Sequence, residues 1–286
     1  MKIIILGSSG FIGSKLVNLL EVEGYAIKTL TRQEFNSTIL VGEIESADVI
    51  INCIGSANVG SSYINTITDF DCNVVIVKKV LEILHKNKLN NLKFINLSSA
   101  AVYGNPTKLP VNEMDLTQPL SPYGHHKLMA EILLREYSLC FDLDTLNLRI
   151  FSAYGRGQSK LLLWDIHKKI QEGNGEIQLF GTGDESRDYI HINDIAQQVL
   201  LAIQHAKFEG EALNVANGSE VQIKQVVQLY KQFYPKQFNY SFSGDIKQGD
   251  PLRWCADIEK MKMWGYQQTV NLEDGIKDYI DWVSKN

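Results

Sequence analysis

Long apolar runs, clustered basic residues and closely spaced cysteines are all missing from this sequence of 286 residues. No run reaches the ~18 apolar residues that a membrane span needs, and the chain opens on a strand-like run with no basic leader segment. The 28 Lys and Arg against 33 Asp and Glu give a net charge of -5 and form no basic patch. We therefore expect no membrane or nucleic-acid partner, and a cytoplasmic location.

Cysteine is sparse as well, which bears on metal and redox chemistry. The four cysteines are scattered and form no Cys-x-x-Cys pair. A zinc site or a disulfide framework needs closer and more regular spacing. We expect no metal, and reduced core or near-core thiols at Cys53, Cys72, Cys140 and Cys255.

Short apolar runs alternate with helical patterns in the first half of the chain. The run at residues 2–6 is nearly all Ile and Leu, as in a parallel strand covered on both faces. Alternation of strands and helices predicts an α/β fold with a Rossmann-type, doubly wound parallel sheet. The expected strands are residues 2–6, 26–31, 48–52, 93–97 and 146–151, and the expected helices include residues 74–84 and 128–137.

Beyond Gly155 the pattern loosens, although helices are expected near residues 160–172, 192–206, 223–233 and 272–283. We predict a main lobe over residues 1–154, to which residues 188–206 return. The remaining segments, 155–187 and 207–286, are expected to form a smaller C-terminal lobe.

A glycine-rich turn, Gly7-Ser8-Ser9-Gly10-Phe11-Ile12-Gly13, joins the first strand to the first helix. Glycine permits the tight turn, and the helix N-terminus offers free N–H groups to a pyrophosphate. The motif predicts a dinucleotide site at Gly7, Gly10, Phe11, Ile12 and Gly13. A ligand-free glycine turn is the alternative.

Two further segments carry acid/base groups. Tyr123 and Lys127 are four residues apart, so they share a helix face, and the ammonium should lower the phenol pKa from its usual value of about 10. His125 and His126 between them are expected on a solvated face. The run Ser98-Ser99-Ala100-Ala101-Val102-Tyr103-Gly104 follows a strand, where open α/β sheets bind their ligands. Taken singly, these serines more often cap backbone groups, and an isolated Tyr-x-x-x-Lys spacing is more often structural than catalytic.

Three motifs follow one another along the chain: the glycine turn, the Ser-Ser-Ala-Ala-Val-Tyr-Gly run, and Ser121-Pro122-Tyr123-Gly124-His125-His126-Lys127. Together they resemble the extended short-chain dehydrogenase/reductases, specifically the nucleotide-sugar epimerase/dehydratase group. The likeness runs nearly end to end. It includes the segments Asp71–Val74, Leu148–Gly155, Phe180–Gly183, Arg187–Asp194, Gly249–Asp250, Ala256–Asp257 and Trp264–Tyr266.

The resemblance implies residue roles. Cofactor pyrophosphate would lie at Gly7, Gly10 and Gly13, and the catalytic triad would be Ser99, Tyr123 and Lys127, with Lys127 also holding the nicotinamide ribose. Substrate contacts would come from Ser99 and Ser152 of the main lobe and from Arg187, Lys247 and Asp250 of the smaller, nucleotide-sugar-binding lobe. A nucleotide sugar is the implied partner, and a homodimer through helices 74–84 and 128–137 is possible.

Ala100 and Ala101 stand where the dehydratases of this family carry Asp-Glu, and the decarboxylases also keep a Glu there. The 3,5-epimerase/reductases place a Cys at the Ala101 position and a His near Gly157, and both are missing here. Methyl groups transfer no protons. What remains is hydride transfer with Tyr123 as the acid/base, in a 4-ketoreductase or a 4-epimerase.

Arg32 ends the second strand where NAD enzymes usually show an acid. A guanidinium suits a 2′-phosphate, so NADP is slightly favoured over NAD, unless Arg32 only stacks on adenine or is solvated. The third strand of the family is also shortened. We therefore favour an NAD(P)H-dependent 4-ketoreductase, with an NAD-dependent UDP-hexose 4-epimerase as the alternative. A non-catalytic dinucleotide sensor is third, because it would need no catalytic phenol.

Overall fold

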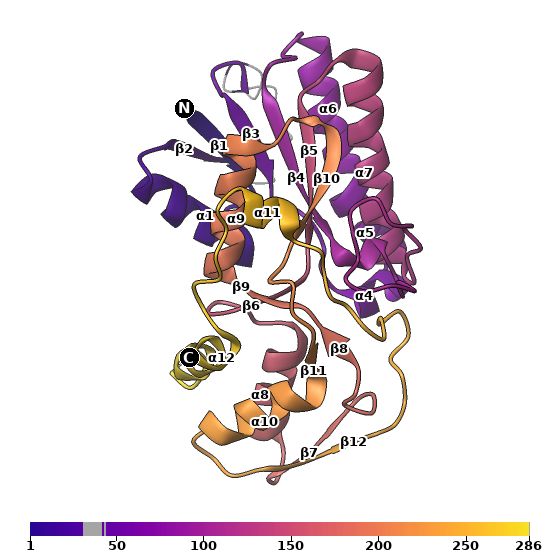
Figure 1. The fold of residues 1–286 in the computed structure, drawn as a ribbon, viewed down its shortest axis with the longest axis vertical. Coiled ribbons are helices and arrows are strands. Elements are labelled where there is room, and N and C mark those ends of the chain that lie inside the picture. The colour runs from indigo at the N-terminus through magenta and orange to yellow at the C-terminus, as the bar shows by residue number, and fades with distance from the viewer. Residues whose placement is uncertain (31–41, 43, 286) are drawn as a thin grey trace.

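Six parallel strands form the central sheet of the computed structural model, which describes residues 1–30, 42 and 44–285 (Figure 1). Their order is β10-β5-β4-β3-β1-β2. The strands are β1 (Lys2–Leu6), β2 (Ala26–Leu30), β3 (Val49–Asn52), β4 (Lys93–Ser99), β5 (Thr145–Ile150) and β10 (Glu209–Val215). The chain runs outward from β1 to β2 and then restarts on the other side at β3. The direction of winding thus reverses at β1 and β3, and ligands bind outside the carboxyl ends of strands at such a point.

Helices cover both faces of this sheet. Helices α1 (Phe11–Val22) and α9 (Ile192–His205) lie on one face, and α6 (Ile76–Lys86) and α7 (Pro122–Phe141) on the other (Figure 1). Successive strand side chains point to opposite faces, so Ile3 and Ile5 join the core under α1 and α9, while Ile4 and Leu6 join the core under α6 and α7. This double burial explains why β1 is apolar at every position.

A smaller lobe lies beyond the carboxyl ends of the strands (Figure 1). Its own core is formed by helices α8 (Leu161–Glu172), α10 (Ile223–Phe233) and α12 (Leu272–Val283). Short paired strands complete it and its border with the sheet: β7 (Glu176–Leu179) with β12 (Asn239–Phe242), β8 (Ser186–Arg187) with β11 (Val221–Gln222), and β6 (Ser152–Tyr154) with β9 (Tyr189–His191). Helices α4 (Val59–Ile64), α5 (Thr66–Phe70) and α11 (Glu259–Met263) are short.

The α/β fold with a parallel sheet is confirmed, with local differences from the predicted elements. A π-helical turn, η1 (Asp71–Val75), precedes α6, and α7 begins at Pro122 because the Ser121 side chain accepts the N–H of Gly124 and caps it. Strand β10 lies in the range 207–286 that we assigned to the smaller lobe, yet it pairs with β5 in the main sheet. Its Leu213 and Val215 side chains are buried in the core under α1 and α9, which places it there. The other lobe boundaries stay a prediction.

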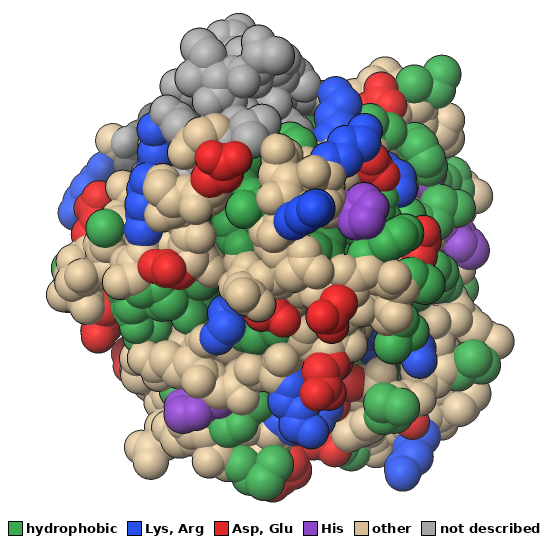
Figure 2. Space-filling model, turned by 90° about the horizontal axis from the view of Figure 1, so that it is seen from above, with side chains coloured by type: hydrophobic (Ala, Val, Ile, Leu, Met, Phe, Trp, Pro, Cys, Tyr) green, Lys and Arg blue, Asp and Glu red, His purple; other side chains and the backbone are tan. Residues whose placement is uncertain are grey.

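No helix in the described part of the chain is long and apolar enough to cross a membrane. The four cysteines are free thiols, and Cys140 is exposed on α7 rather than near the core. The residues described contain no cluster of three or more potential metal-binding side chains. On the face seen in Figure 2, Lys and Arg side chains alternate with Asp and Glu rather than forming one basic surface. A two-fold contact through α6 and α7 stays a prediction.

A buried ion pair fastens α7 to the sheet. Arg149 on β5 donates from Nε and Nη2 to the Glu131 carboxylate on α7, at 3.0 and 2.7 Å. Its Nη1 donates to the Tyr103 hydroxyl at 2.8 Å, and the Ser98 hydroxyl of β4 donates to Glu131 at 2.5 Å. Such bidentate geometry with further hydrogen bonds offsets the cost of removing two charges from water. Helix α7 is thereby fixed against β4 and β5.

We expect Arg149→Met to lower the free energy of unfolding by about 3–5 kcal/mol, because it leaves the Glu131 carboxylate buried without a partner. Urea denaturation followed by circular dichroism measures this. The control is Lys168→Met, which removes an exposed pair with Glu172 and should cost less than about 1 kcal/mol. Equal losses in the two variants would show that the buried pair does not hold α7.

Candidate active site

The glycine turn after β1 is built for close approach of backbone atoms. Gly7 has φ +77°, and the N–H of Gly10 donates to its carbonyl at 3.0 Å. A Cβ at Gly13 would lie 2.3 Å from the Gly7 oxygen, so a side chain there would push α1 away from the turn. The N-cap of α1, Gly10, offers no side chain to the first N–H groups of the helix. Those donors fit a pyrophosphate.

The side chains of Phe11 and Ile12 pack against the core rather than forming the turn itself. Both are partly buried hydrophobic residues that pack against the core under α1 and α9. Their predicted contribution to cofactor binding would therefore come from their backbone N–H groups at the start of α1. Arg32, the residue on which the NADP prediction rests, lies outside the described residues.

The structure brings the predicted triad together at the carboxyl end of β4. The Ser99 side chain lies beside Tyr123, and its Oγ accepts the N–H of Ala101 at 3.2 Å. One helical turn after Tyr123, the Lys127 ammonium donates to the Leu97 carbonyl at 2.8 Å. Tyr123 and Lys127 are only 7 % and 6 % exposed. A phenol, a hydroxyl and an ammonium thus share one buried site.

Burial controls the electrostatics of this site more than the tyrosine–lysine pair does. It raises the pKa of Tyr123 to about 12, against the opposing hydrogen bond from Ser99. It lowers the pKa of Lys127 to about 8, against the opposing charge of Asp69. Our expectation that Lys127 lowers the phenol pKa is wrong for the protein alone, since the Lys127 ammonium lies 6.0 Å from the centre of the Tyr123 ring and donates to a carbonyl instead. The phenol therefore holds its proton unless a further positive charge is bound nearby.

Two glycines that the sequence reasoning passed over shape the site. A Cβ at Gly124 would lie 2.7 Å from the Ala101 carbonyl, so this glycine lets α7 approach the end of β4. A Cβ at Gly55 would lie 2.8 Å from Asn73 Oδ1 and 3.0 Å from Lys127 Nζ. Asn73 belongs to the π-helical turn η1, and its Oδ1 is buried without a hydrogen-bond partner. π-helical turns are frequent at functional sites.

The predicted substrate residues gather at the border of the smaller lobe. Arg187 is largely buried, with a side chain 12 % exposed, and its guanidinium lies over the Trp254 ring and 4.0 Å from the Asp250 carboxylate. Asp250 closes a turn by donating its N–H to the Lys247 carbonyl at 3.1 Å. Ser152 donates its N–H to the Asp188 carbonyl, one residue from Arg187. The roles of these residues in binding stay a prediction.

The two histidines of α7 differ. His125 is exposed, but the expectation of a solvated face is wrong for His126, which is buried with its Nδ1 2.6 Å from Asp69 Oδ2. Residue 126 follows Tyr123 by three positions, so it falls on the same buried face of the helix. Asp69, on α5, gave no sequence signal, because its partner is 57 residues away.

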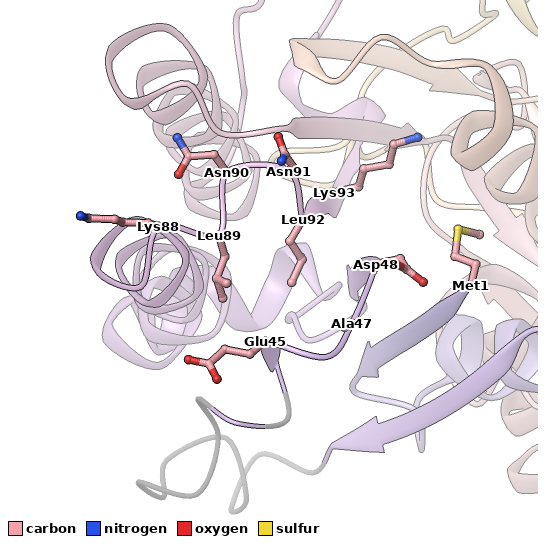
Figure 3. Close-up of a pocket in the computed structure, with 10 residues that line it drawn as sticks. All are labelled: Met1, Glu45, Ala47, Asp48, Lys88, Leu89, Asn90, Asn91, Leu92 and Lys93. Carbon is pink, nitrogen blue, oxygen red and sulfur yellow. The ribbon is translucent and has the colours of Figure 1, made fainter.

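A hollow at the amino ends of the strands, opposite the triad, is a weaker candidate for an active site (Figure 3). It lies at the amino ends of β1, β3 and β4, among Met1, Asp48 and Lys93. Asp48 Oδ2 there already accepts the backbone N–H of Lys2 at 2.6 Å. Ligands of open α/β sheets bind at the carboxyl ends instead, where the triad is.

We expect Gly13→Ala to weaken dinucleotide binding by about tenfold or more, a loss of at least ~1.4 kcal/mol, because the new methyl group displaces α1 from the turn. Isothermal titration calorimetry measures the dissociation constant. Gly60→Ala on α4 is the matched control, since its Cβ would meet Asn58 only at 3.4 Å. Unchanged binding in Gly13→Ala would remove the turn from the cofactor site.

The chain resembles known proteins over nearly its whole length. It is 28% identical over 304 residues to a UDP-glucose 4-epimerase of Halalkalibacterium halodurans, covering 91% of this chain and 88% of that one. Its structure superposes with a TM-score of 0.88 on UDP-glucuronic acid 4-epimerase from Bacillus cereus in complex with UDP-glucuronic acid and NAD, at 25% identity over 100% and 99% of the two chains. The UDP-glucose 4-epimerase of Thermotoga maritima with UDP-glucose gives a TM-score of 0.85, also at 25% identity over 100% and 99%.

A family-level match covers most of the main lobe. Residues 3–216 match the NAD dependent epimerase/dehydratase family, a span that holds the glycine turn and the triad. The resemblance seen in the sequence motifs is thereby confirmed: the chain belongs to the NAD-dependent epimerase/dehydratase family of enzymes.

Proposed function

We propose that this protein is an NAD-dependent 4-epimerase of a UDP-hexose or UDP-hexuronic acid. The relatives and solved structures that support this reading are 4-epimerases of UDP-glucose and UDP-glucuronic acid, and one of the structures holds NAD. From the sequence we favoured a 4-ketoreductase that uses NADP, with the epimerase as the alternative. The comparisons favour that alternative and lend the NADP preference no support.

The observation that carries the proposal is the set of side chains at the end of β4. Ser99, Tyr123 and Lys127 lie near one another. The two positions that follow Ser99 hold only the methyl groups of Ala100 and Ala101. This segment therefore supplies one acid/base, the Tyr123 phenol, beside one orienting hydroxyl. One acid/base suffices for transfer of a hydride and a proton at a single carbon, which fits a 4-epimerase or a 4-ketoreductase and argues against a dehydratase. The relatives named above favour the epimerase of these two.

The residues present fit the dinucleotide. Gly7, Gly10 and the first N–H groups of α1 would hold its pyrophosphate, and Lys127 would hold the nicotinamide ribose. When bound, the oxidised nicotinamide supplies a hydride acceptor and a positive charge, which favours the Tyr123 phenolate that burial disfavours.

The chain's own residues then manage one proton. Tyr123 takes the proton of the sugar 4-hydroxyl as the C4 hydride leaves, and Ser99 orients the reacting oxygen. When the 4-keto sugar presents its other face and takes the hydride back, Tyr123 would return the proton to the oxygen. One hydride and one proton leave and return, so the reaction consumes no cofactor.

The smaller lobe would hold the rest of the substrate. Arg187 is buried at its border beside Asp250, and Lys247 lies in the same turn as Asp250. A diphosphate would offer the guanidinium a stronger partner than a carboxylate 4.0 Å away. This arrangement supports binding of a nucleotide diphosphate at Arg187.

Incubation with a panel of UDP-, dTDP-, GDP- and CDP-sugars tests the function. We expect NMR to show the C4 epimer of a UDP-sugar with no net consumption of cofactor. Tyr123→Phe should bind NAD normally but turn over about a hundredfold more slowly or worse, because the transferable proton is gone. Stoichiometric oxidation of NADPH with a 4-keto sugar would identify a reductase instead, and loss of one water from the sugar would identify a dehydratase.

We expect Arg187→Ala to raise the KM for the UDP-sugar by about ten- to a hundredfold, as a charge-assisted hydrogen bond is worth ~1.5–3 kcal/mol. The dissociation constant for NAD should change little. Lys224→Ala, which removes an exposed pair with Asp184 in the same lobe, should leave both values near wild type. A KM unmoved by Arg187→Ala would make the guanidinium structural.

A further inference from the structure

A buried aspartate–histidine pair adjoins the triad. Asp69 on α5 and His126 on α7 are 3 % and 9 % exposed, and Asp69 Oδ2 lies 2.6 Å from His126 Nδ1. The Phe70 ring meets the imidazole edge-on at 5.3 Å and helps to exclude water from it. His126 immediately precedes Lys127 in the chain, so the pair borders the site through α7.

The Asp69 carboxylate is held at one oxygen only. Its Oδ1 is buried and has no hydrogen-bond partner. One turn later, the Asn73 side-chain amide donates to the Asp69 carbonyl at 3.0 Å, and Asn73 Oδ1 and Lys127 Nζ both lie within 3.0 Å of the Cβ position of Gly55. Asn73 thus contacts the main chain of Asp69 and lies near Lys127. In a water-poor interior, a carboxylate acts on neighbouring charges more strongly than it would in water.

Groups from four other segments and from its own helix surround Lys127. The groups that face it are Asp69 from α5, the thiol of Cys53 after β3, the thiol of Cys72 in η1, the Leu97 carbonyl of β4 and Glu131 of its own helix. The Glu131 charge is matched by the guanidinium of Arg149. Burial raises the pKa of the Cys53 thiol to about 12, so this thiol is neutral near pH 7.

Asp69 brings a second carboxylate close to Lys127. Among the groups that oppose the effect of burial on the Lys127 pKa, Asp69 contributes most. The same carboxylate disfavours the phenolate of Tyr123 and so raises its pKa. Its field therefore acts on both ionisable members of the triad.

We propose that Asp69 and His126 are positioning residues of this active site: His126 fixes the Asp69 carboxylate, and that carboxylate keeps the Lys127 ammonium charged. Where the pair is tested through catalysis, the inference rests on the proposed epimerase activity. His126 is needed because it is the only hydrogen-bond partner of the Asp69 carboxylate among the described residues, and a buried carboxylate without a partner is costly. His126 holds one oxygen of the Asp69 carboxylate and the other has no hydrogen-bond partner, so the pair is not bonded to the phenol and acts on the triad through charge.

The pH profile of kcat gives the first test. Turnover that needs the Lys127 ammonium is lost as pH rises through its pKa. Asp69→Asn removes the charge that raises this pKa, so the alkaline limb should move to lower pH by about one unit. His126→Leu should move it in the same direction, whereas His126→Gln, which keeps an N–H donor for Asp69, should stay nearer wild type. Asp71→Asn, an exposed change two residues away, is the matched control and should not move it.

Direct titration of Lys127 gives a second test that needs no substrate. Protein labelled with ¹³C at lysine Cε is titrated by NMR, and Lys127→Arg identifies the resonance. We expect the Lys127 midpoint to fall in Asp69→Asn and His126→Leu. If Asp69→Asn fails to fold, the comparison of His126→Leu with His126→Gln decides. Midpoints equal to wild type in the folded variants would overturn the inference, whether or not the protein proves to be an epimerase.

Discussion

The bidentate contact between Arg149 and Glu131 is the constraint on which the active site depends. Glu131 is one turn beyond Lys127 on α7, and Arg149 is on β5 beside the strand that carries Ser99. Ser98 also donates to Glu131, so the end of β4 and helix α7 are tied to the same carboxylate. A shift of α7 along the sheet would separate Tyr123 and Lys127 from Ser99 together. Catalytic groups work only when they are held in a near-attack geometry. The Arg149–Glu131 pair takes no part in the chemistry, but it fixes the relative positions of the groups that do.

A second buried carboxylate ties the smaller lobe to the sheet. Asp188 accepts the backbone N–H groups of Asn217, Gly218 and Ala256 at 2.9, 3.0 and 3.0 Å. It directly follows Arg187, and its carbonyl accepts the N–H of Ser152. The border between the lobes is therefore fixed where the diphosphate is expected.

Burial gives the protein alone a phenol that keeps its proton and an ammonium of weakened basicity. Both effects follow from the same cause, since low polarity disfavours either charged form. In the proposed epimerase, the phenol would become a base only when the cofactor's charge is present, and proton transfer would be coupled to cofactor binding. The proposed role of the Asp69–His126 pair is to add a counter-charge at the lysine in the same dry site.

The sequence by itself determined the fold class and the core of the active site, because both depend on local patterns. The apolar run of β1, the glycine spacing before α1 and the four-residue interval from Tyr123 to Lys127 are all readable along the chain. The place of Ser99 at the ligand-binding edge followed from its position after a buried strand, whereas its expected role in the triad came from the family resemblance. Arg187 and Asp250 came from the family resemblance, and the structure brings them within ion-pair distance.

Tertiary structure alone decided what depends on distant partners. The burial of His126 requires Asp69, 57 residues earlier, and the place of β10 in the main sheet requires β5. The pKa of Tyr123 also depends on the tertiary structure. The nearby ammonium of Lys127 suggests a lowered pKa, but the packed site shows that desolvation is the larger effect and raises it. Spacing along a chain records which side chains share a helix face. It carries no record of how deeply water is excluded or which segment arrives from elsewhere, and those two quantities determine the chemistry of a buried charge.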